Sequence, residues 1–431
     1  MKRVMISDLK TKKEMDRVLL NGWIHRINNF KNFSFVTLRD RSGLLQMIVE
    51  DEKILEKLKL EISVEVVGTL IFNDKSPKGR EVHVDDLEIL GEGEYNLLPF
   101  SINGREIDAS LEKQLDYRTI TLRRRDKRSV FKIQQGIVEG FREFLTKEGF
   151  YEIHTPKIIG SETEGGSEVF TVDYFGQRAF LAQSPQFYKQ MMVGSGMERV
   201  FEIGAAYRAE LHSTWRHLNE YMSLDLEMGF ISDEHDIMDL EEKMMKYIVH
   251  KLESEYKEEL DILKVELPKI DKIPRIPLEE AQDILLEKYG KKSTDGNIDG
   301  EGEKLIYEYV KEKYDSEFVF LTDYPKSKRP LYTMPKKENP EKTNSFDLIF
   351  RGLEITTGGQ RINSYSQLKR RIVQEGIKPE VMDFYLETFK YGMPPHGGLA
   401  IGLERLTMML LKLENIREAT LFPRDINRIK P

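Results

Sequence analysis

Arginine and acidic side chains gather in three short segments of the sequence, and their spacing suits the binding of phosphate groups. In the first segment, Arg208 and Glu210 stand near the end of an expected strand, and Arg216 and His217 follow after a polar loop. Side chains two residues apart on a strand point to the same face, so Arg208 and Glu210 are expected to face one site. Arginine offers a planar set of donors to phosphate or carboxylate oxygens and stays charged at any relevant pH. One such arginine is usually a surface charge, and only the convergence of several is informative.

The second segment, residues 347–361, combines hard oxygen donors with glycines. Asp347 and Glu354 are expected on opposite faces of a regular strand, but a bend at the glycines would bring the Glu354 carboxylate and the Thr357 hydroxyl to one ion. A few protein oxygens of this kind suit a Mg²⁺ ion that also bridges nucleotide phosphates. Taken alone, a Glu-x-x-Thr spacing of this kind is nearly always structural.

The third segment, residues 397–405, is a glycine-rich strand that runs directly into a helix. Its glycines let a ligand approach the backbone closely, and Arg405 would place a cation at a phosphate or over a purine ring. The sequence has no GxGxxG turn after a strand and no GxxxxGK[ST] loop, so a nucleotide must be held in another way.

The elements that precede these segments predict a separate domain. Residues 17–95 contain five short runs of alternating apolar and polar residues, with one helical stretch between the third and the fourth. This order predicts an OB-type five-stranded β-barrel, whose exposed face commonly takes single-stranded nucleic acid. A small barrel without a ligand is the alternative at this level. We therefore expect a barrel domain at 1–95, followed by a polar hinge at 96–126.

The larger part of the chain, residues 127–431, opens with a long amphipathic helix that ends at Glu148-Gly149. Strands joined in pairs by tight turns then alternate with helices, which predicts a largely antiparallel sheet flanked by helices and an α+β fold class. Residues 259–316, rich in Lys, Glu and Gly, are expected to form a helical surface insertion. The later helices are expected near residues 235–257, 278–289, 302–314, 366–375, 379–391 and 403–413.

The composition excludes several classes of protein. The 431 residues carry a net charge of -8, which argues against indiscriminate coating of nucleic acid, because such binding rests on Lys and Arg. The absence of cysteine excludes disulfides, thiolate metal sites and a cysteine nucleophile. The sequence has no apolar run of about 20 residues and no signal-peptide pattern. No membrane segment is therefore predicted, and a cytoplasmic location is expected.

Together, the three segments resemble motifs of the class II aminoacyl-tRNA synthetases in order and spacing. YRAE at 207–210 with RHLNE at 216–220 resembles motif 2, GLER at 402–405 resembles motif 3, and residues 149–156 resemble motif 1. The preceding barrel resembles the anticodon-binding domain of the subclass that charges Asp, Asn and Lys. The resemblance implies a six-stranded antiparallel catalytic sheet, a homodimer, and ATP bound with Mg²⁺. It also implies that an amino acid forms an adenylate and is then passed to the terminal ribose of tRNA.

Carried over residue by residue, the resemblance assigns the nucleotide site. Arg208, Glu210 and Arg405 would be the catalytic residues, and Glu354 and Thr357 would hold the metal. Positioning and charge neutralisation at phosphorus suffice for this chemistry, so no covalent nucleophile is needed. Leu211, Trp215 and Thr357 depart from the usual family pattern, but threonine keeps the hydroxyl that serine normally supplies. The expected ATP-binding residues are Arg208, Glu210, Arg216, His217, Leu218, Glu354, Gly402, Leu403, Glu404 and Arg405.

The stretch QSPQFYKQ at 183–190 resembles that of aspartyl enzymes of the archaeal and eukaryotic type. Lys189 and Arg361 would present two positive charges to the side-chain carboxylate of aspartate. Asparagine would leave those buried cations unpaired, at a cost of several kcal/mol. An asparaginyl enzyme remains the alternative, and so does a non-catalytic RNA-binding paralogue, although such proteins typically lose the arginines kept here. The expected aspartate-binding residues are Glu164, Gln186, Lys189, Arg208, Asp225, Thr357 and Arg361.

On the predicted barrel, His25, Phe35, Gln46 and Pro77 resemble residues that contact anticodon bases. Stacking of a base on an aromatic ring is worth about 1 to 3 kcal/mol. The alternative for Phe35 is a place in the barrel core. His25 with Pro77 resembles the combination found in enzymes that accept both tRNA-Asp and tRNA-Asn, so both tRNAs are candidate partners.

Overall fold

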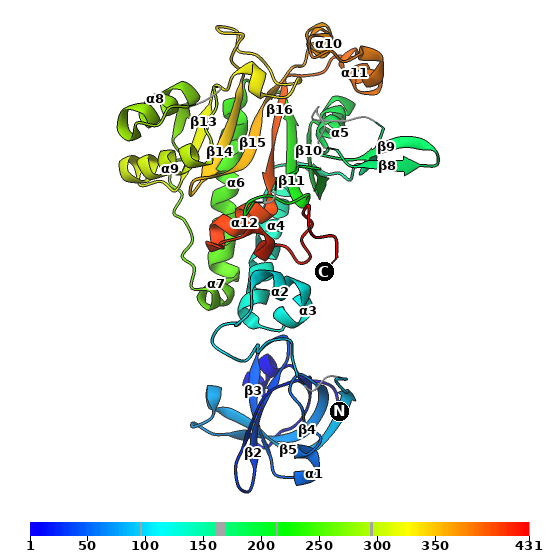
Figure 1. The fold of residues 1–431 in the computed structure, drawn as a ribbon, viewed down its shortest axis with the longest axis vertical. Helices are drawn as coiled ribbons and strands as arrows, with labels where there is room; N and C mark the ends of the chain where they lie inside the picture. The colour runs from blue at the N-terminus through cyan, green and yellow to red at the C-terminus, as the bar shows by residue number, and fades with distance from the viewer. Residues whose placement is uncertain (95–96, 161–168, 213, 294–295, 431) are drawn as a thin grey trace. The chain divides into compact units, whose positions relative to one another are not determined.

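The computed structural model describes residues 1–94, 97–160, 169–212, 214–293 and 296–430. Contacts among these residues divide the chain into two compact units, Met1–Arg125 and Asp126–Pro431 (Figure 1). No helix in the described ranges is both long enough and apolar enough to cross a membrane.

The first unit contains a closed five-stranded barrel with the strand order β1-β2-β3-β5-β4. Alternate residues point inward, and Val36, Leu38 and Met47 have no exposed surface. The short helix α1 (Glu52–Leu55) lies between the third and fourth strands, so the predicted OB-type order is confirmed. Residues 96–126, expected to be a polar hinge, include the short helices α2 (Leu111–Asp116) and α3 (Arg118–Thr121). The barrel strands are β1 (Arg17–Asn29), β2 (Ser34–Arg39), β3 (Leu44–Val49), β4 (Ser63–Phe72) and β5 (Arg80–Gly91).

The second unit is built on an eight-stranded sheet with the order β12-β13-β14-β15-β16-β11-β10-β6. Its six central strands are antiparallel, as the resemblance implies, and one short parallel strand is added at each edge. The strands are β6 (Tyr151–Glu152), β10 (Arg199–Tyr207), β11 (Glu220–Gly229), β12 (Arg275–Pro277), β13 (Phe318–Thr322), β14 (Ser345–Phe350), β15 (Leu353–Arg361) and β16 (His396–Gly402).

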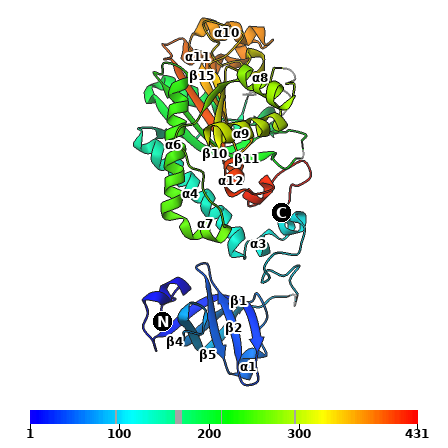
Figure 2. The same cartoon turned by 90° about the vertical axis from the view of Figure 1, so that its left-hand side faces the viewer.

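Two long helices, α4 (Arg125–Lys147) and α6 (Glu234–Glu255), lie side by side and cover one face of this sheet (Figure 2). Close packing of the pair depends on glycine, because a Cβ atom on Gly140 would lie 3.1 Å from the Ile248 side chain. Apolar residues at every second position of β11 and β16 point toward these helices and form the main core. The residues between them therefore face the opposite side of the sheet, which these two helices do not cover.

The predicted surface insertion, residues 259–316, is helical as expected but does not lie apart from the domain. It supplies the edge strand β12, and its helices α8 (Leu278–Tyr289) and α9 (Gly300–Tyr314) form a second core with the neighbouring strands. Leu285, Ile306 and Val310 in these helices are fully buried. The segment is therefore an integral edge of the eight-stranded sheet, which the charge-rich sequence did not indicate.

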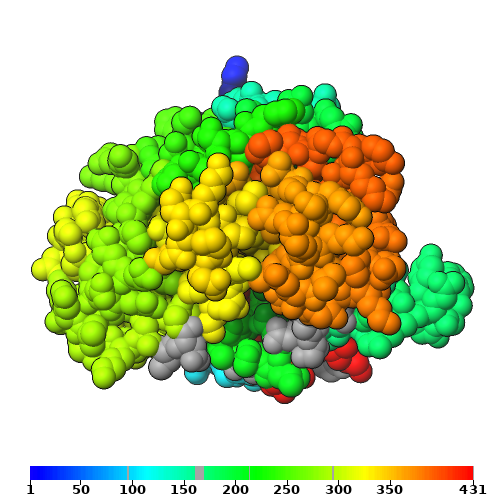
Figure 3. Space-filling model, turned by 90° about the horizontal axis from the view of Figure 1, so that it is seen from above, coloured from blue at the N-terminus to red at the C-terminus, as the bar shows by residue number. Residues whose placement is uncertain are grey.

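Smaller elements complete the second unit. A three-stranded sheet, β7 (Ile158–Ile159), β9 (Gln177–Leu181) and β8 (Thr171–Tyr174), carries a hairpin that projects from the side of the unit (Figure 3). The remaining helices are α5 (Gln186–Met192), α7 (Lys257–Leu263), α10 (Tyr365–Gln374), α11 (Asp383–Phe389) and α12 (Leu403–Leu411).

Candidate active site

A pocket of about 130 Å³ opens on the face of the sheet opposite α4 and α6. Strands β11, β16 and β15 are hydrogen-bonded neighbours, so the three sequence segments meet there. Leu403 is the exception among the predicted ATP-binding residues, because it packs in the main core. The lining includes the other predicted nucleotide and metal residues, namely Arg208, Glu210, Arg216, His217, Leu218, Glu354, Thr357, Gly402, Glu404 and Arg405.

The hairpin between β10 and β11 positions the first group of these side chains. Arg208 N–H donates to the Asn219 carbonyl at 2.9 Å, and the Asn219 amide donates to the carbonyls of Arg208 and Glu210 at 2.7 and 3.0 Å. The Glu210 carboxylate lies 3.8 Å from the Arg208 guanidinium and 4.0 Å from the His217 ring. Asn219 was not among the predicted site residues, yet its side chain closes the hairpin that presents them.

On β15 the predicted metal residues lie together. Thr357 Oγ1 donates to the Glu354 carboxylate at 3.1 Å, and Arg405 lies 3.8 Å from the same carboxylate. Burial and the nearby Asp347 raise the pKa of Glu354, while Arg405 opposes that rise. Within the described residues, no three His, Cys, Asp or Glu side chains are arranged to hold a metal ion. The Glu354 carboxylate and the Thr357 hydroxyl are hard oxygen donors that fit Mg²⁺ only with further oxygens, such as those of a nucleotide.

Glu404 in the pocket wall makes a contact between a helix and a strand. Both of its carboxylate oxygens accept from the Met222 N–H at 3.1 Å, which ties α12 to β11. Burial raises the pKa of Glu404 to about 7. Its contacts in this structure are thus structural ones beside the predicted nucleotide pocket.

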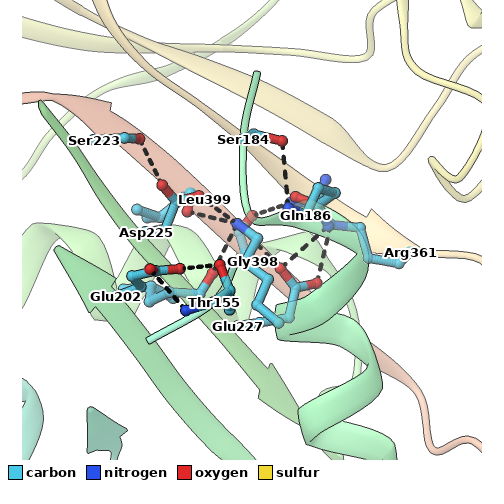
Figure 4. A network of polar contacts seen from close by, with 12 residues as sticks. Thr155, Ser184, Gln186, Glu202, Ser223, Asp225, Glu227, Arg361, Gly398 and Leu399 are labelled. Carbon is cyan, nitrogen blue, oxygen red and sulfur yellow. Dashed lines mark hydrogen bonds and ion pairs between the residues drawn. The ribbon is translucent and has the colours of Figure 1, made fainter. Parts of the chain in front are cut away.

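Four of the predicted aspartate-binding residues, Gln186, Lys189, Asp225 and Arg361, form a second cluster on the same face. Figure 4 shows Gln186, Asp225 and Arg361 of this cluster around Glu227. Arg208 and Thr357 line the first pocket instead. Lys189 Nζ, almost fully buried, donates to Asp225 Oδ1 at 3.0 Å and to the carbonyls of Leu226 and Leu399 at 3.3 and 3.1 Å. Ser223, which lines the predicted nucleotide pocket, donates to Asp225 at 2.5 Å. Strand β11 therefore connects the two predicted binding regions.

Glu227 lies between the two predicted cations and was missed by the sequence analysis. Its carboxylate is 3.4 Å from Lys189 Nζ and 3.1 Å from Arg361 Nε, and the Gln186 amide lies 3.5 Å away. A Cβ atom on Gly398 would lie 2.2 Å from a Glu227 oxygen, so glycine makes room for this carboxylate. Lys189 and Arg361 are consequently neutralised by Asp225 and Glu227, rather than left open as two unpaired charges. The sequence did contain a signal for this residue. Glu227 follows Asp225 by two residues on one strand, so both side chains point to the same face of the sheet.

Glu164, predicted to approach the substrate ammonium group, lies outside the described residues.

The predicted anticodon residues are distributed over the outer surface of the barrel. Phe35 is half-buried and lies outside the barrel core, with its ring 5.3 Å from that of the exposed Phe30. The Gln46 amide donates to the buried Glu81 at 2.9 Å, and Pro77 is exposed at the start of a short 3₁₀ helix, Pro77–Gly79. The structure thus places Phe35 on the surface and not in the core.

His25 belongs to an ion network in the first unit. Its Nδ1 lies 3.2 Å from Arg39 and 3.7 Å from the buried Glu61, which also pairs with Arg39 and with Arg123 at 2.5 and 2.9 Å. Burial opposes ionisation of Glu61, but hydrogen bonds from His25, Arg39 and Arg123 outweigh it and hold its pKa at about 2. The ring of His25 is thereby oriented by its neighbours.

Comparisons with known proteins agree with this geometry. Residues 110–426 match the family described as tRNA synthetases class II (D, K and N), and residues 18–90 match the OB-fold nucleic acid binding domain. The chain is 47% identical over 439 residues to an aspartate–tRNA(Asp/Asn) ligase of Aeropyrum pernix, with 99% of each chain covered. It is 42% identical over 424 residues to an aspartate–tRNA(Asp) ligase of Pyrococcus abyssi, with 96% of each chain covered.

A solved structure shares the whole fold. The asparaginyl-tRNA synthetase of Pyrococcus horikoshii, complexed with asparaginyl-adenylate, matches with a TM-score of 0.92 and 31% identity, and each chain is covered completely. The order of the motifs, the pocket that they form and these full-length matches show that the chain belongs to the class II aminoacyl-tRNA synthetases of the D, K and N group.

Proposed function

We propose that this synthetase activates L-aspartate with ATP and transfers it to the 3′ end of tRNA-Asp and of tRNA-Asn. The observation that carries the proposal is the pair of buried cations, Lys189 and Arg361, which lie on the same face of the sheet as the predicted nucleotide pocket and are held in place by Asp225 and Glu227. Lys and Arg offer only hydrogen-bond donors, so they suit a carboxylate better than the amide nitrogen of asparagine. The ligase names of the relatives support the same substrate.

In the proposed mechanism the enzyme positions charges and forms no covalent bond to the substrate. Arg208 would contact the α-phosphate and the substrate carboxylate, which brings the attacking oxygen to phosphorus. Arg216, His217 and Arg405 would neutralise the outer phosphates as pyrophosphate leaves. Mg²⁺, held by Glu354 and Thr357 together with the nucleotide, would supply a Lewis acid. Gln186 and Asp225 would orient the amino acid and Lys189, respectively.

A homodimer in the cytoplasm is part of the proposal. Apolar side chains are exposed on the short edge strand β6 and on the β8–β9 hairpin, including Tyr151 at 61% and Phe175 at 91%. A contiguous patch of exposed apolar side chains is typical of a surface that a second subunit covers, and we place such a patch at these two segments.

The proposed activity is tested by ATP–pyrophosphate exchange with aspartate and asparagine in separate reactions, followed by charging of purified tRNA-Asp and tRNA-Asn. We expect exchange with aspartate and charging of both tRNAs. Exchange with asparagine alone would contradict the proposal and support the asparaginyl alternative. Charging of tRNA-Asp alone would show that tRNA-Asn is not a substrate.

Replacing His25 by tryptophan is expected to lower charging of tRNA-Asn more than charging of tRNA-Asp. The larger ring would change the surface next to Arg39, where the two anticodons are to be distinguished. The measurement is the ratio of kcat/KM for the two tRNAs, because general damage to the barrel lowers both values alike. His25→Gln, which keeps a polar side chain of moderate size, is the matched control and should change the ratio less.

A further inference from the structure

Helix α9, which belongs to the predicted insertion, contacts the loop that carries Arg216. Glu303, in the first turn of α9, is only 8% exposed, and its Oε2 lies 3.4 Å from Arg216 Nη1. The same oxygen accepts from the backbone N–H of Glu354 at 3.3 Å. One carboxylate oxygen therefore joins the arginine of the loop to the strand that carries the predicted metal residues.

Two neighbours of Glu303 hold the same loop. A Cβ atom on Gly300 would lie 2.9 Å from Arg216 Nη1, so the guanidinium lies directly against the glycine face of α9. One turn further on, Lys304 Nζ lies 5.7 Å from the centre of the Trp215 ring. Trp215 departs from the family pattern, and this contact gives it a partner within the fold. Gly300 and Lys304 of α9 thus contact Arg216 and Trp215 of the loop, respectively.

We infer that Glu303 is a positioning residue that pairs with Arg216 while the nucleotide pocket is empty and releases it to the phosphates of ATP. The inference rests on the proposed role of Arg216 in binding ATP. Phosphate oxygens and the Glu303 carboxylate are competing acceptors for the same guanidinium.

The contacts favour such an exchange of partners. The distance of 3.4 Å from Arg216 to Glu303 is long for a charge-assisted hydrogen bond, so little is lost when the pair opens. After release, the Glu303 carboxylate still accepts from the Glu354 N–H and is not left buried without a donor. The ion pair therefore holds Arg216 at the pocket, and it can open at little energetic cost.

The test is equilibrium binding of ATP, measured by calorimetry on the full chain, with the variant Glu303→Gln. Glutamine keeps the length and an acceptor oxygen but removes the charge that competes with phosphate. We expect ATP to bind about two- to fivefold more tightly, the scale of a partly exposed ion pair. Glu301→Gln is the matched control on α9, because Glu301 is exposed and pairs with Lys291 instead, and it should leave ATP binding unchanged.

A simple loss of negative charge near the pocket would also strengthen ATP binding, so the same change is made in an Arg216→Ala background. There Glu303→Gln is expected to have no effect, because the competing pair no longer exists. An equal gain with and without Arg216, or weaker or unchanged ATP binding in Glu303→Gln, would overturn the inference. Glu303→Asp, too short to reach Arg216, gives a second variant with the same expected direction. If the protein binds ATP but shows no aspartate-dependent exchange, the proposed function is refuted. The comparison of ATP binding between Glu303→Gln and the wild type remains valid in that case.

Discussion

Replacing Lys189 by methionine is expected to reduce aspartate-dependent ATP–pyrophosphate exchange by about 100-fold, because the substrate carboxylate would lose a charged donor in a buried site, at a cost of about 3 kcal/mol. Lys189 is the cation that contacts both Asp225 and Glu227. Without it, the carboxylate of aspartate would meet two acidic side chains and one arginine. The measurement is kcat/KM for aspartate in the exchange reaction.

The same substitution is expected to lower stability, since Asp225 and Glu227 lose a buried partner. Two controls separate this effect from loss of substrate recognition. The first control is ATP binding by Lys189→Met, which should stay near that of the wild type. The second control is Lys251→Met. It removes a buried lysine that pairs with Glu143 and Glu255 on the helical face, so it should lower stability but leave aspartate-dependent exchange unchanged. Near-normal exchange in Lys189→Met would show that the lysine does not bind the amino acid.

Replacing Glu241 by glutamine is expected to stabilise the protein at pH 9 and not at pH 5. Glu241 lies fully buried on α6. Among the described residues, neither of its carboxylate oxygens has a hydrogen bond of good geometry. The Thr356 hydroxyl is nevertheless close enough to favour the ionised form of Glu241. Burial, with a smaller contribution from Asp347, raises the pKa of Glu241 from 4.5 to about 8.

The sign of the pH dependence follows from proton binding. Between pH 4.5 and 8 the folded protein keeps the Glu241 proton that the unfolded chain has lost, so stability falls as the pH rises through this window. The loss is on the order of 5 kcal/mol and is complete above the folded-state pKa. Glutamine has no such ionisation, but its buried amide costs about 1 to 3 kcal/mol at every pH.

Urea unfolding at pH 5 and pH 9 measures this difference. We expect Glu241→Gln to be no more stable than the wild type at pH 5 and more stable at pH 9. Glu253→Gln, at an exposed position of the same helix, is the matched control and should shift both values equally. The same difference between variant and wild type at both pH values would mean that Glu241 ionises normally in the folded protein.

Much of the fold could be predicted from the sequence because it depends on local periodicity. The barrel strands alternate with period two, and α4 repeats its apolar residues every three or four positions, so each pattern identifies its own element. The catalytic segments could be recognised because they combine arginines, acids and glycines within a few residues, and those residues do line one pocket. Lys189 and Asp225, both predicted to bind aspartate, also lie together, with Lys189 Nζ 3.0 Å from Asp225 Oδ1.

The partners of these residues could not be predicted, because they come from elements far away in the sequence. Glu227 reaches Arg361 because β11 and β15 both flank β16, and Glu303 reaches Arg216 because α9 packs at the edge of the sheet. The surface insertion expected at 259–316 illustrates the same limit, since its charged residues gave no sign of the buried face of α9. Residue types and spacing by themselves determined which chemistry the chain can perform. Only the strand order and helix packing decided which charges lie within 4 Å of one another, and the strength of an ionic contact depends on that distance and on burial.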